Sequence, residues 1–269
     1  MSLINLSVLL LSFVAFGESV IQISPFITKG TEVQFAELPF LISIQQGSVH
    51  LCTGTLISEK FSLSSARCNS YRNISLLTIE YGSSIINPGN KTRENIVGVS
   101  KIIFHPNFNY TTIENDIVII ESTTEIRLTD FYEAYAHIAS SGARFSSGVL
   151  ATHAGWGDVA PGVRSKFLHR ANLRIISQAE CIEAAGETKF PFFNTICAMD
   201  ESVVCAGDLG APLLVNRVVV GISSFRNGDE CVGTPGRYPN AYIAVSFYTR
   251  WIEQVTGITY RVNTFLSRN

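Results

Sequence analysis

Short apolar runs separated by turn residues dominate the middle of the chain. Branched and aromatic residues gather in Ile74–Tyr81, Val97–Phe104, Ile117–Ile120 and Val218–Ser223, and turn residues gather at 87–90 and 226–229. Such runs are typical of strands, and their spacing favours antiparallel sandwich or barrel architecture over alternating strands and helices. The pattern therefore predicts an all-β fold.

One segment near the end of the chain has helical spacing instead. Within Val245–Val255, the residues Phe247, Trp251 and Val255 recur every four positions, which places them on one face of a helix. We therefore predict a terminal helix that docks on the body of the protein. A stretch richer in Ala, Ser and Gly, from about Thr129 to Gly148, is the best candidate for a linker between two halves.

The first 17 residues carry no charge. Their apolar stretch, Leu6–Phe16, is shorter than the roughly 20 residues of a membrane span. Ala15 and Gly17 are small residues that suit signal peptidase cleavage before Glu18. We therefore expect residues 1–17 to be a secretory signal and the protein to be extracellular. A buried first strand or helix is the alternative, which the absence of an amphipathic period disfavours.

Charge and composition exclude several classes of function. The chain has 269 residues, with 20 Lys and Arg against 22 Asp and Glu, so its formal net charge is -2. This balance disfavours nucleic acid or an anionic membrane as a partner. Apolar residues make up 46% and charged residues only 16%, so the chain can bury a sizeable core, in one large all-β unit or in two halves.

The expected secretion decides how the six cysteines are interpreted. An oxidising compartment favours disulfides, although the sequence alone does not choose among the 15 possible connectivities of six cysteines. No Cys-x-x-Cys pair occurs, and the histidines are scattered at His50, His105, His137, His153 and His169. We therefore expect neither a zinc site nor a cofactor. Sequons at Asn73, Asn90 and Asn109 predict N-glycosylation in surface loops, the alternative being that they stay unmodified.

Three strings far apart in the sequence belong together. Residues 66–68 read Ala-Arg-Cys, 115–117 read Asn-Asp-Ile and 207–212 read Gly-Asp-Leu-Gly-Ala-Pro. They resemble the Ala-His-Cys, Asn-Asp-Ile and Gly-Asp-Ser-Gly-Gly-Pro motifs of the chymotrypsin/trypsin-like serine proteases. Asp116 follows Arg67 by 49 residues and Leu209 follows Asp116 by 93, close to the separations of about 45 and 93 in a Ser-His-Asp triad. The strings at 27–30, 155–157 and 220–222 extend the resemblance, which covers most of Ile27–Val255.

The resemblance implies a fold of two six-stranded antiparallel β-barrels packed side by side with a cleft between them. The first barrel is expected over about 27–138 and the second, with the terminal helix, over about 139–269. Residues 18–26 are then a short propeptide-like segment. The implied disulfides are Cys52–Cys68, Cys181–Cys197 and Cys205–Cys231.

The same resemblance shows an altered catalytic triad. Arg67 stands at the histidine position and Leu209 at the serine position, so that only Asp116 is kept. A guanidinium stays protonated and cannot act as a general base, and leucine has no nucleophilic atom. Loss of both groups is expected to remove about 10⁶-fold of the rate. Rescue by His50 or His105 is disfavoured because neither has a visible nucleophile beside it.

The remnants of the triad have two structural interpretations. Arg67 pairs with Asp116 through charge-assisted hydrogen bonds, or the Arg67 side chain swings outward into the cleft mouth and backbone donors hold Asp116. Ser64 and Ser65 are expected to satisfy backbone groups at a strand end.

The resemblance also assigns roles around the old cleft. Asp208 is the acceptor of a free amino group at Ile27, but Phe26 stands where activation expects Lys or Arg; alternatively, Asp208 bonds to nearby backbone. Gly207 and Leu209 carry the amides of an oxyanion-hole remnant. Three positions belong to the specificity pocket, namely Val203 at its base and Arg226 and Gly236 on its walls. Arg226 is expected to fill the cleft, or else to lie in solvent.

These observations together predict a secreted, proteolytically inactive serine protease homologue of the type found among inactivated arthropod and mite paralogues. We expect it to bind proteins as a regulator, decoy or inhibitor of a proteolytic or host-defence cascade, with cascade proteases or complement components as its partners. The alternative is an active serine endopeptidase that uses unrecognised residues.

Overall fold

The computed structural model describes residues 30–34, 37–86, 95–128, 134–160, 163–186, 193–200, 205, 207–226 and 239–260; for Ala160, Phe225 and Arg226 it describes the backbone alone. Within these ranges no helix combines the length and the apolar composition needed to cross a membrane. The expected signal and propeptide segments, Ile27, Asn90, Val203, Cys231 and Gly236 lie outside the described residues.

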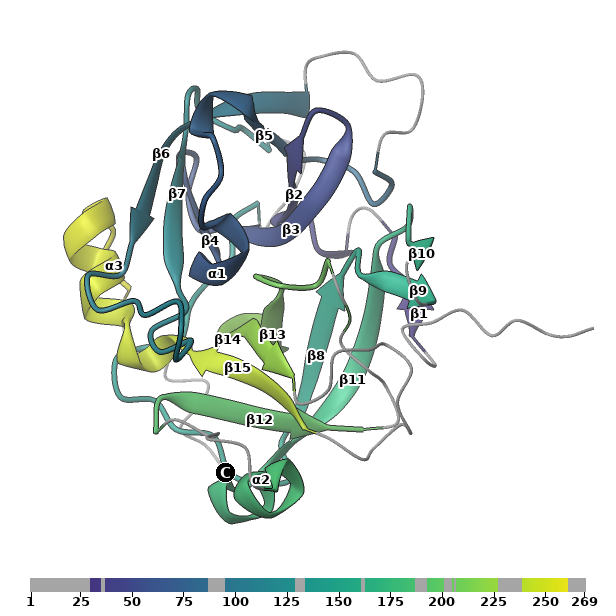
Figure 1. Cartoon of the computed structure of the whole chain (residues 1–269), viewed down its shortest axis with the longest axis vertical. Coiled ribbons are helices and arrows are strands. Elements are labelled where there is room, and N and C mark those ends of the chain that lie inside the picture. Colours follow the sequence, from purple (N-terminus) through teal and green to yellow (C-terminus); the bar gives the residue numbers. More distant parts are fainter. Residues whose placement is uncertain are drawn as a thin grey trace, which may run out of the picture.

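Six antiparallel strands close the first barrel in the order β2-β3-β4-β7-β6-β5 (Figure 1). They are β2 (Leu41–Gln46), β3 (Val49–Leu56), β4 (Phe61–Ser64), β5 (Leu77–Glu80), β6 (Ile96–Phe104) and β7 (Val118–Ser122). Aliphatic side chains from all six strands fill the interior, and Ile42, Leu63 and Ile119 are completely buried. Burial of such side chains contributes about 1.5–3 kcal/mol each, which makes this core a main source of stability.

The second barrel is closed by β8 (Leu150–Gly155), β11 (His169–Ile176), β12 (Thr195–Met199), β15 (Asn240–Ala244), β14 (Val218–Arg226) and β13 (Pro212–Val215), which pairs back onto β8. Alternate residues of β11 are buried, as expected for a strand with one inward face. The short strand β1 (Thr31–Glu32) pairs with β11, and β9 (Asp158–Ala160) forms a hairpin with β10 (Val163–Arg164). The all-β prediction and the two six-stranded barrels are therefore confirmed.

Helical elements are few and short. They are α1 (Ala66–Asn69), η2 (Ile74–Leu76), α2 (Gln178–Ala185), η4 (Val245–Phe247) and α3 (Thr249–Thr256). Ser177 and Glu180 form a capping box at the start of α2, and Gly186 ends this helix with a positive φ of 66°.

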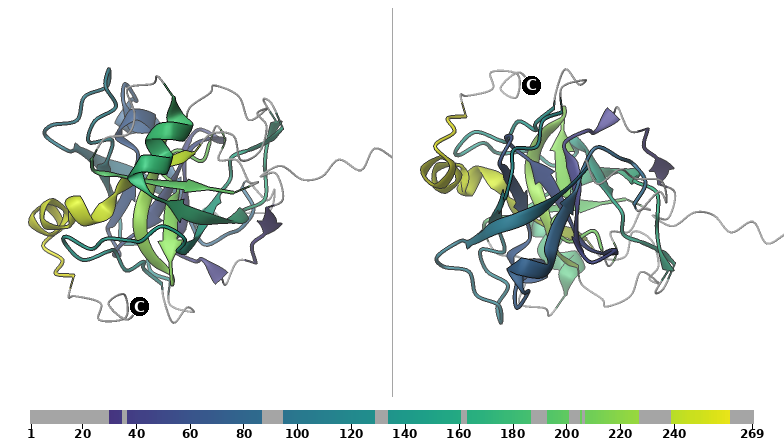
Figure 2. Two further views of the ribbon diagram at one scale, coloured as in Figure 1. Left: turned by 90° about the horizontal axis from the view of Figure 1, so that it is seen from below. Right: turned by 90° about the horizontal axis from the view of Figure 1, so that it is seen from above.

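The terminal helix is present, but it begins later than the sequence predicts. Residues 245–247 form a 3₁₀ turn, and α3 begins only after Tyr248. The change of helix type rotates Phe247 outward to 48% exposure, while Tyr248 and Ile252 are buried in its place. The rings of Tyr248 and Trp251 lie 5.1 and 5.0 Å from the His105 ring of the first barrel. In both views of Figure 2, α3 lies on the side of the molecule away from β9 and β10.

Other sequence predictions differ in detail. The run Ile74–Tyr81 begins as the 3₁₀ turn η2 and becomes a strand only at Leu77. Two of the three expected disulfides are formed, Cys52–Cys68 between β3 and α1 and Cys181–Cys197 between α2 and β12. Cys205 is also disulfide-bonded, and its expected partner is among the residues outside the described ranges. The expected linker falls between the last strand of the first barrel and the first strand of the second.

Candidate functional site

The loop 207–210 lies between the two barrels and is fixed to the first one. Thr53 of β3 donates its amide hydrogen to the Leu209 carbonyl oxygen over 3.0 Å. Gly210 has a φ of +85°, and a side chain there would overlap the Ser64 hydroxyl and the Thr53 carbonyl. Only glycine fits this position, so the sequence holds the loop tightly against β3 and β4.

Asp116 is completely buried where β7 begins, and three groups donate hydrogen bonds to its carboxylate. The Ser65 hydroxyl lies 2.9 and 3.0 Å from its two oxygens, the Arg67 amide lies 2.5 Å from Oδ1, and the Ser224 hydroxyl lies 2.5 Å from Oδ2. Burial raises the pKa of Asp116 above its ordinary value, against the opposing effect of these hydrogen bonds and of the nearby Arg67 charge. The groups that donate hydrogen bonds to Asp116 are all neutral.

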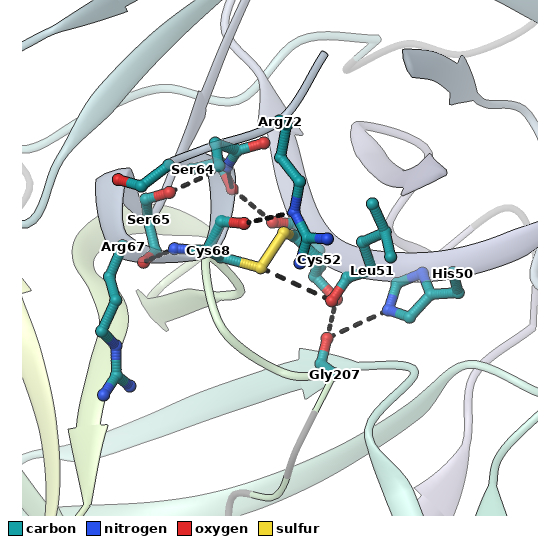
Figure 3. Close-up of a disulfide and its surroundings, with 12 residues drawn as sticks. His50, Leu51, Cys52, Ser64, Ser65, Arg67, Cys68, Arg72 and Gly207 are labelled. Carbon is teal, nitrogen blue, oxygen red and sulfur yellow. Dashed lines mark hydrogen bonds between the residues drawn. A yellow bond between two sulfur atoms is a disulfide. The ribbon is translucent and has the colours of Figure 1, made fainter. Parts of the chain in front are cut away.

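The Arg67 side chain turns away from Asp116. Its Nη2 donates to the carbonyl oxygen of Ser224 in β14 over 2.6 Å, and Figure 3 shows the side chain running away from the Cys52–Cys68 disulfide. The expected side-chain pairing of Arg67 with Asp116 is wrong. The physical reason is that Arg67 lies in the first turn of α1, where no helical carbonyl satisfies its amide, so that this amide takes Asp116 as its acceptor.

The alternative interpretation agrees better with the structure. A backbone donor holds Asp116, and the partly exposed Arg67 side chain turns away from it and reaches the second barrel. Ser64 donates to the Thr53 carbonyl, as expected of a strand-end serine. Ser65 caps α1 through the Cys68 amide and in addition binds Asp116.

Leu209 is partly buried and packs against the main hydrophobic core. Beside it, the Gly207 carbonyl accepts hydrogen bonds from His50 Nε2 over 3.0 Å and from the Thr53 hydroxyl over 3.1 Å (Figure 3). The Arg164 guanidinium packs so closely over Gly207 that a Cβ there would lie 2.8 Å from Nη1. Arg164 also donates to the His50 carbonyl and binds Asp158, so that a cation covers this end of the loop.

His50 forms a buried hydrogen-bonded pair with Ser43, which no motif in the sequence indicated. The Ser43 hydroxyl lies 2.7 Å from His50 Nδ1. Burial lowers the pKa of His50 to about 4, so the ring is neutral near pH 7. Because the Gly207 carbonyl can only accept, Nε2 carries the proton and Nδ1 accepts from Ser43. His50 thereby fixes the orientation of the Gly207 peptide.

Asp208 is also completely buried. It accepts hydrogen bonds from the amides of Gly157 (2.8 Å) and Cys205 (3.0 Å), and His153 Nε2 lies 3.7 Å from its Oδ1. These backbone bonds match the second of the two expectations for Asp208.

Three further candidate residues are described at least in part. The backbone of Arg226 pairs with Asn240 at the end of β14. Asn73 and Asn109 are exposed, and each side chain accepts a hydrogen bond from the backbone two residues later. Among the described residues, no group of three or more His, Cys, Asp or Glu side chains is placed to hold a metal ion.

Two closed barrels with a buried aspartate and a glycine-flanked loop between them define a protein of the two-barrel serine protease fold. Residues 27–252 match the profile of the trypsin family, and the chain belongs to this family. It is 30% identical to trypsin beta of Drosophila erecta over 86% of this chain and 88% of the relative. It is 31% identical to granzyme-like protein 1 of Rattus norvegicus over 76% and 79%, and 30% identical to trypsin Blo t 3 of Blomia tropicalis over 85% and 85%.

Proposed function

We propose that this trypsin-family protein is secreted, has no proteolytic activity and acts by binding other proteins. The resemblance of the sequence motifs carries the proposal: Arg67 and Leu209 stand where the family's motifs have the catalytic base and the nucleophile. A guanidinium accepts no proton at any accessible pH, and a leucine has no atom that attacks a carbonyl.

The contacts of Arg67 add a second reason. Its guanidinium bonds to the backbone carbonyl of Ser224, at a point where β14 does not pair regularly with β15. An extended peptide that pairs with this strand needs the same kind of backbone acceptor. Arg67 therefore competes with substrate binding as well as removing the base.

An active peptidase that uses other residues is the rival, and the Ser43–His50 pair is the observation that favours it. Ser43 is 1% exposed and His50 is 4% exposed, so neither meets a substrate in this conformation. His50 Nε2 bonds to the Gly207 carbonyl and not to a carboxylate. The ring therefore lacks the aspartate that stabilises the imidazolium in a catalytic triad. A pKa of about 4 leaves His50 a weak base.

A stable protein that lacks catalytic groups can act by binding other proteins, and loops held by a rigid scaffold are the usual binding surface. We therefore assign the protein a role as regulator, decoy or inhibitor in a proteolytic or host-defence cascade such as complement. This assignment rests on the secretory signal, the sequons and the altered site together.

Covalent labelling separates the proposal from its rival. The purified secreted protein is incubated with a fluorophosphonate probe, with active trypsin as the positive control and the Ser43→Ala variant as the matched control. We expect no labelling of either form. Labelling of the wild type that disappears in Ser43→Ala contradicts the proposal and identifies the nucleophile.

A cascade assay tests the binding role. Complement activation in plasma is followed with and without added protein, and bound components are identified after cross-linking. A decoy or inhibitor lowers the output and a cofactor raises it. Unchanged output with no cross-linked component, in plasma and in haemolymph, contradicts the assignment to such a cascade.

A further inference from the structure

A completely buried histidine faces a completely buried carboxylate in the second barrel. His153 lies on β8, where strand alternation places it on the same face as buried Ala151. Its Nε2 is 3.7 Å from Oδ1 of Asp208, and both side chains are 0% exposed. Neither ring nitrogen of His153 has a hydrogen-bond partner. Nothing in the motifs or in the altered triad explains this residue.

The environment of Asp208 demands compensation of its charge. The carboxylate packs so closely on Gly155 and Gly157 that a Cβ at either position would overlap it. A carboxylate without water needs donors and an opposite charge. The amides of Gly157 and Cys205 supply the donors. In the described part of the chain, the contact with His153 is the only ion pair that Asp208 forms.

The pKa of Asp208 agrees with this geometry. Burial alone would raise it, but the His153 side chain and the amides of Cys205 and Gly157 hold the pKa of this carboxyl below its usual range. The charged form of Asp208 is therefore the favoured one in the folded protein.

The other titratable groups that face this pair supply no positive charge. The Tyr242 ring lies 5.8 Å from that of His153, and burial together with Asp208 raises the pKa of Tyr242 well above its ordinary value, so the phenol stays neutral. His50, which also senses the charge of Asp208, has a pKa of about 4 and is neutral. Among the described residues, His153 is therefore the basic side chain in contact with the Asp208 carboxylate.

We propose that His153 is a positioning residue that holds the Asp208 carboxylate in place inside the uncleaved chain. The loop 207–210 then takes its ordered place between the barrels without a free amino group at Ile27. The inference holds whether or not the cleft is catalytic, and it means that the surface formed by this loop is ready in the intact protein.

A double-mutant cycle on the full chain tests the pairing. His153→Leu and Asp208→Asn are made singly and together, and the unfolding equilibrium is measured in urea at pH 7. Each single change is expected to raise the unfolding constant by about 100-fold or more, since it leaves one buried group without its partner. The double variant is expected to unfold at least about tenfold less readily than the product of the single effects. Coupling below tenfold overturns the proposal, because two residues that do not act on each other give additive effects.

Hydrogen exchange tests the independence from cleavage and needs no variant of the pair. Phe26→Arg creates a cleavable junction before Ile27, and exchange of the amides of 207–211 is compared before and after the cut. We expect the exchange rates to stay within about threefold, because His153 already orders the loop. Exchange that slows by more than threefold on cleavage shows that the amino terminus is required and overturns the proposal.

Discussion

The two completely buried aspartates of the site differ in what surrounds their carboxylates. Asp116 is held by two hydroxyls and one amide, all neutral, and burial raises its pKa. Asp208 has two amides and a histidine, and its pKa lies below the usual range in spite of burial. The comparison teaches that the Asp116 carboxylate is held by neutral hydrogen-bond donors with the Arg67 charge only nearby, whereas the carboxylate that orders the loop keeps a buried histidine in contact.

Neutralising each carboxylate in turn gives the largest expected effect. Asp208→Asn is expected to cost about 3 kcal/mol or more of unfolding free energy, because it removes a buried carboxylate that two amides and His153 hold in place. Asp116→Asn is expected to cost only about 1 kcal/mol, because loss of hydrogen bonds is offset by relief of a desolvated charge. Urea unfolding at pH 7 measures both. A larger loss for Asp116→Asn contradicts the comparison.

Crowding the carboxylate of Asp208 comes next. In Gly157→Ala the new methyl group overlaps the Asp208 carboxylate, and we expect a loss of about 3 kcal/mol from overpacking. Gly98→Ala is the matched control, because its Cβ meets only the Thr123 side chain, at 3.1 Å. Thermal unfolding of the two variants compares them. Equal stability of the two shows that Asp208 can move away without cost.

Lowering the pH tests the role of His50, which bonds to Gly207 next to Asp208. Unfolded His50 binds a proton near its ordinary pKa of 6.5, whereas folded His50 binds one only near pH 4. Its contribution to stability is therefore complete above pH 6.5 and is lost as the pH falls toward 4, by about 2 kcal/mol between pH 7 and pH 5. His50→Gln, which keeps a donor and an acceptor, is expected to lack this part of the pH dependence. Identical losses in wild type and variant contradict the neutral state of His50.

Removing the Arg67 side chain has the smallest expected effect. Arg67→Met keeps the backbone amide that binds Asp116 and loses the bond to the Ser224 carbonyl. We expect the unfolding free energy to fall by less than about 1 kcal/mol, since loss of the bond to Ser224 is offset by removal of the buried Nε, which has no hydrogen-bond partner. A loss of about 3 kcal/mol in urea unfolding means that the guanidinium compensates Asp116 after all.

The sequence predicts the fold because its signals are local or come from fixed motifs. The apolar runs and turn clusters predict strands, and the three strings around Arg67, Asp116 and Leu209 predict two barrels. The disulfides Cys52–Cys68 and Cys181–Cys197 are the pairs that the family resemblance implies. The terminal helix is less well predicted: the four-residue spacing from Phe247 is correct only for a continuous α-helix, and the 3₁₀ turn breaks it.

The contacts that decide the chemistry depend on chain segments far apart in sequence. Ser224 reaches Asp116 across 108 residues and receives Arg67 across 157. Ser43 and Gln45 alternate with apolar residues in β2, a pattern that predicts one face of the strand in solvent. Both side chains are buried, because the two faces of this strand are covered. His153 has no motif of its own, and its meaning appears only when the loop places Asp208 beside it.

The most direct test of the proposed inactivity is turnover itself. Peptide hydrolysis is measured for contaminant-free wild type, for Ser43→Ala and for the double variant Arg67→His with Leu209→Ser, which places the proposed missing base and nucleophile beside Asp116. The account predicts that wild type and Ser43→Ala stay at the buffer background. Wild-type turnover at a rate typical of an active trypsin contradicts it.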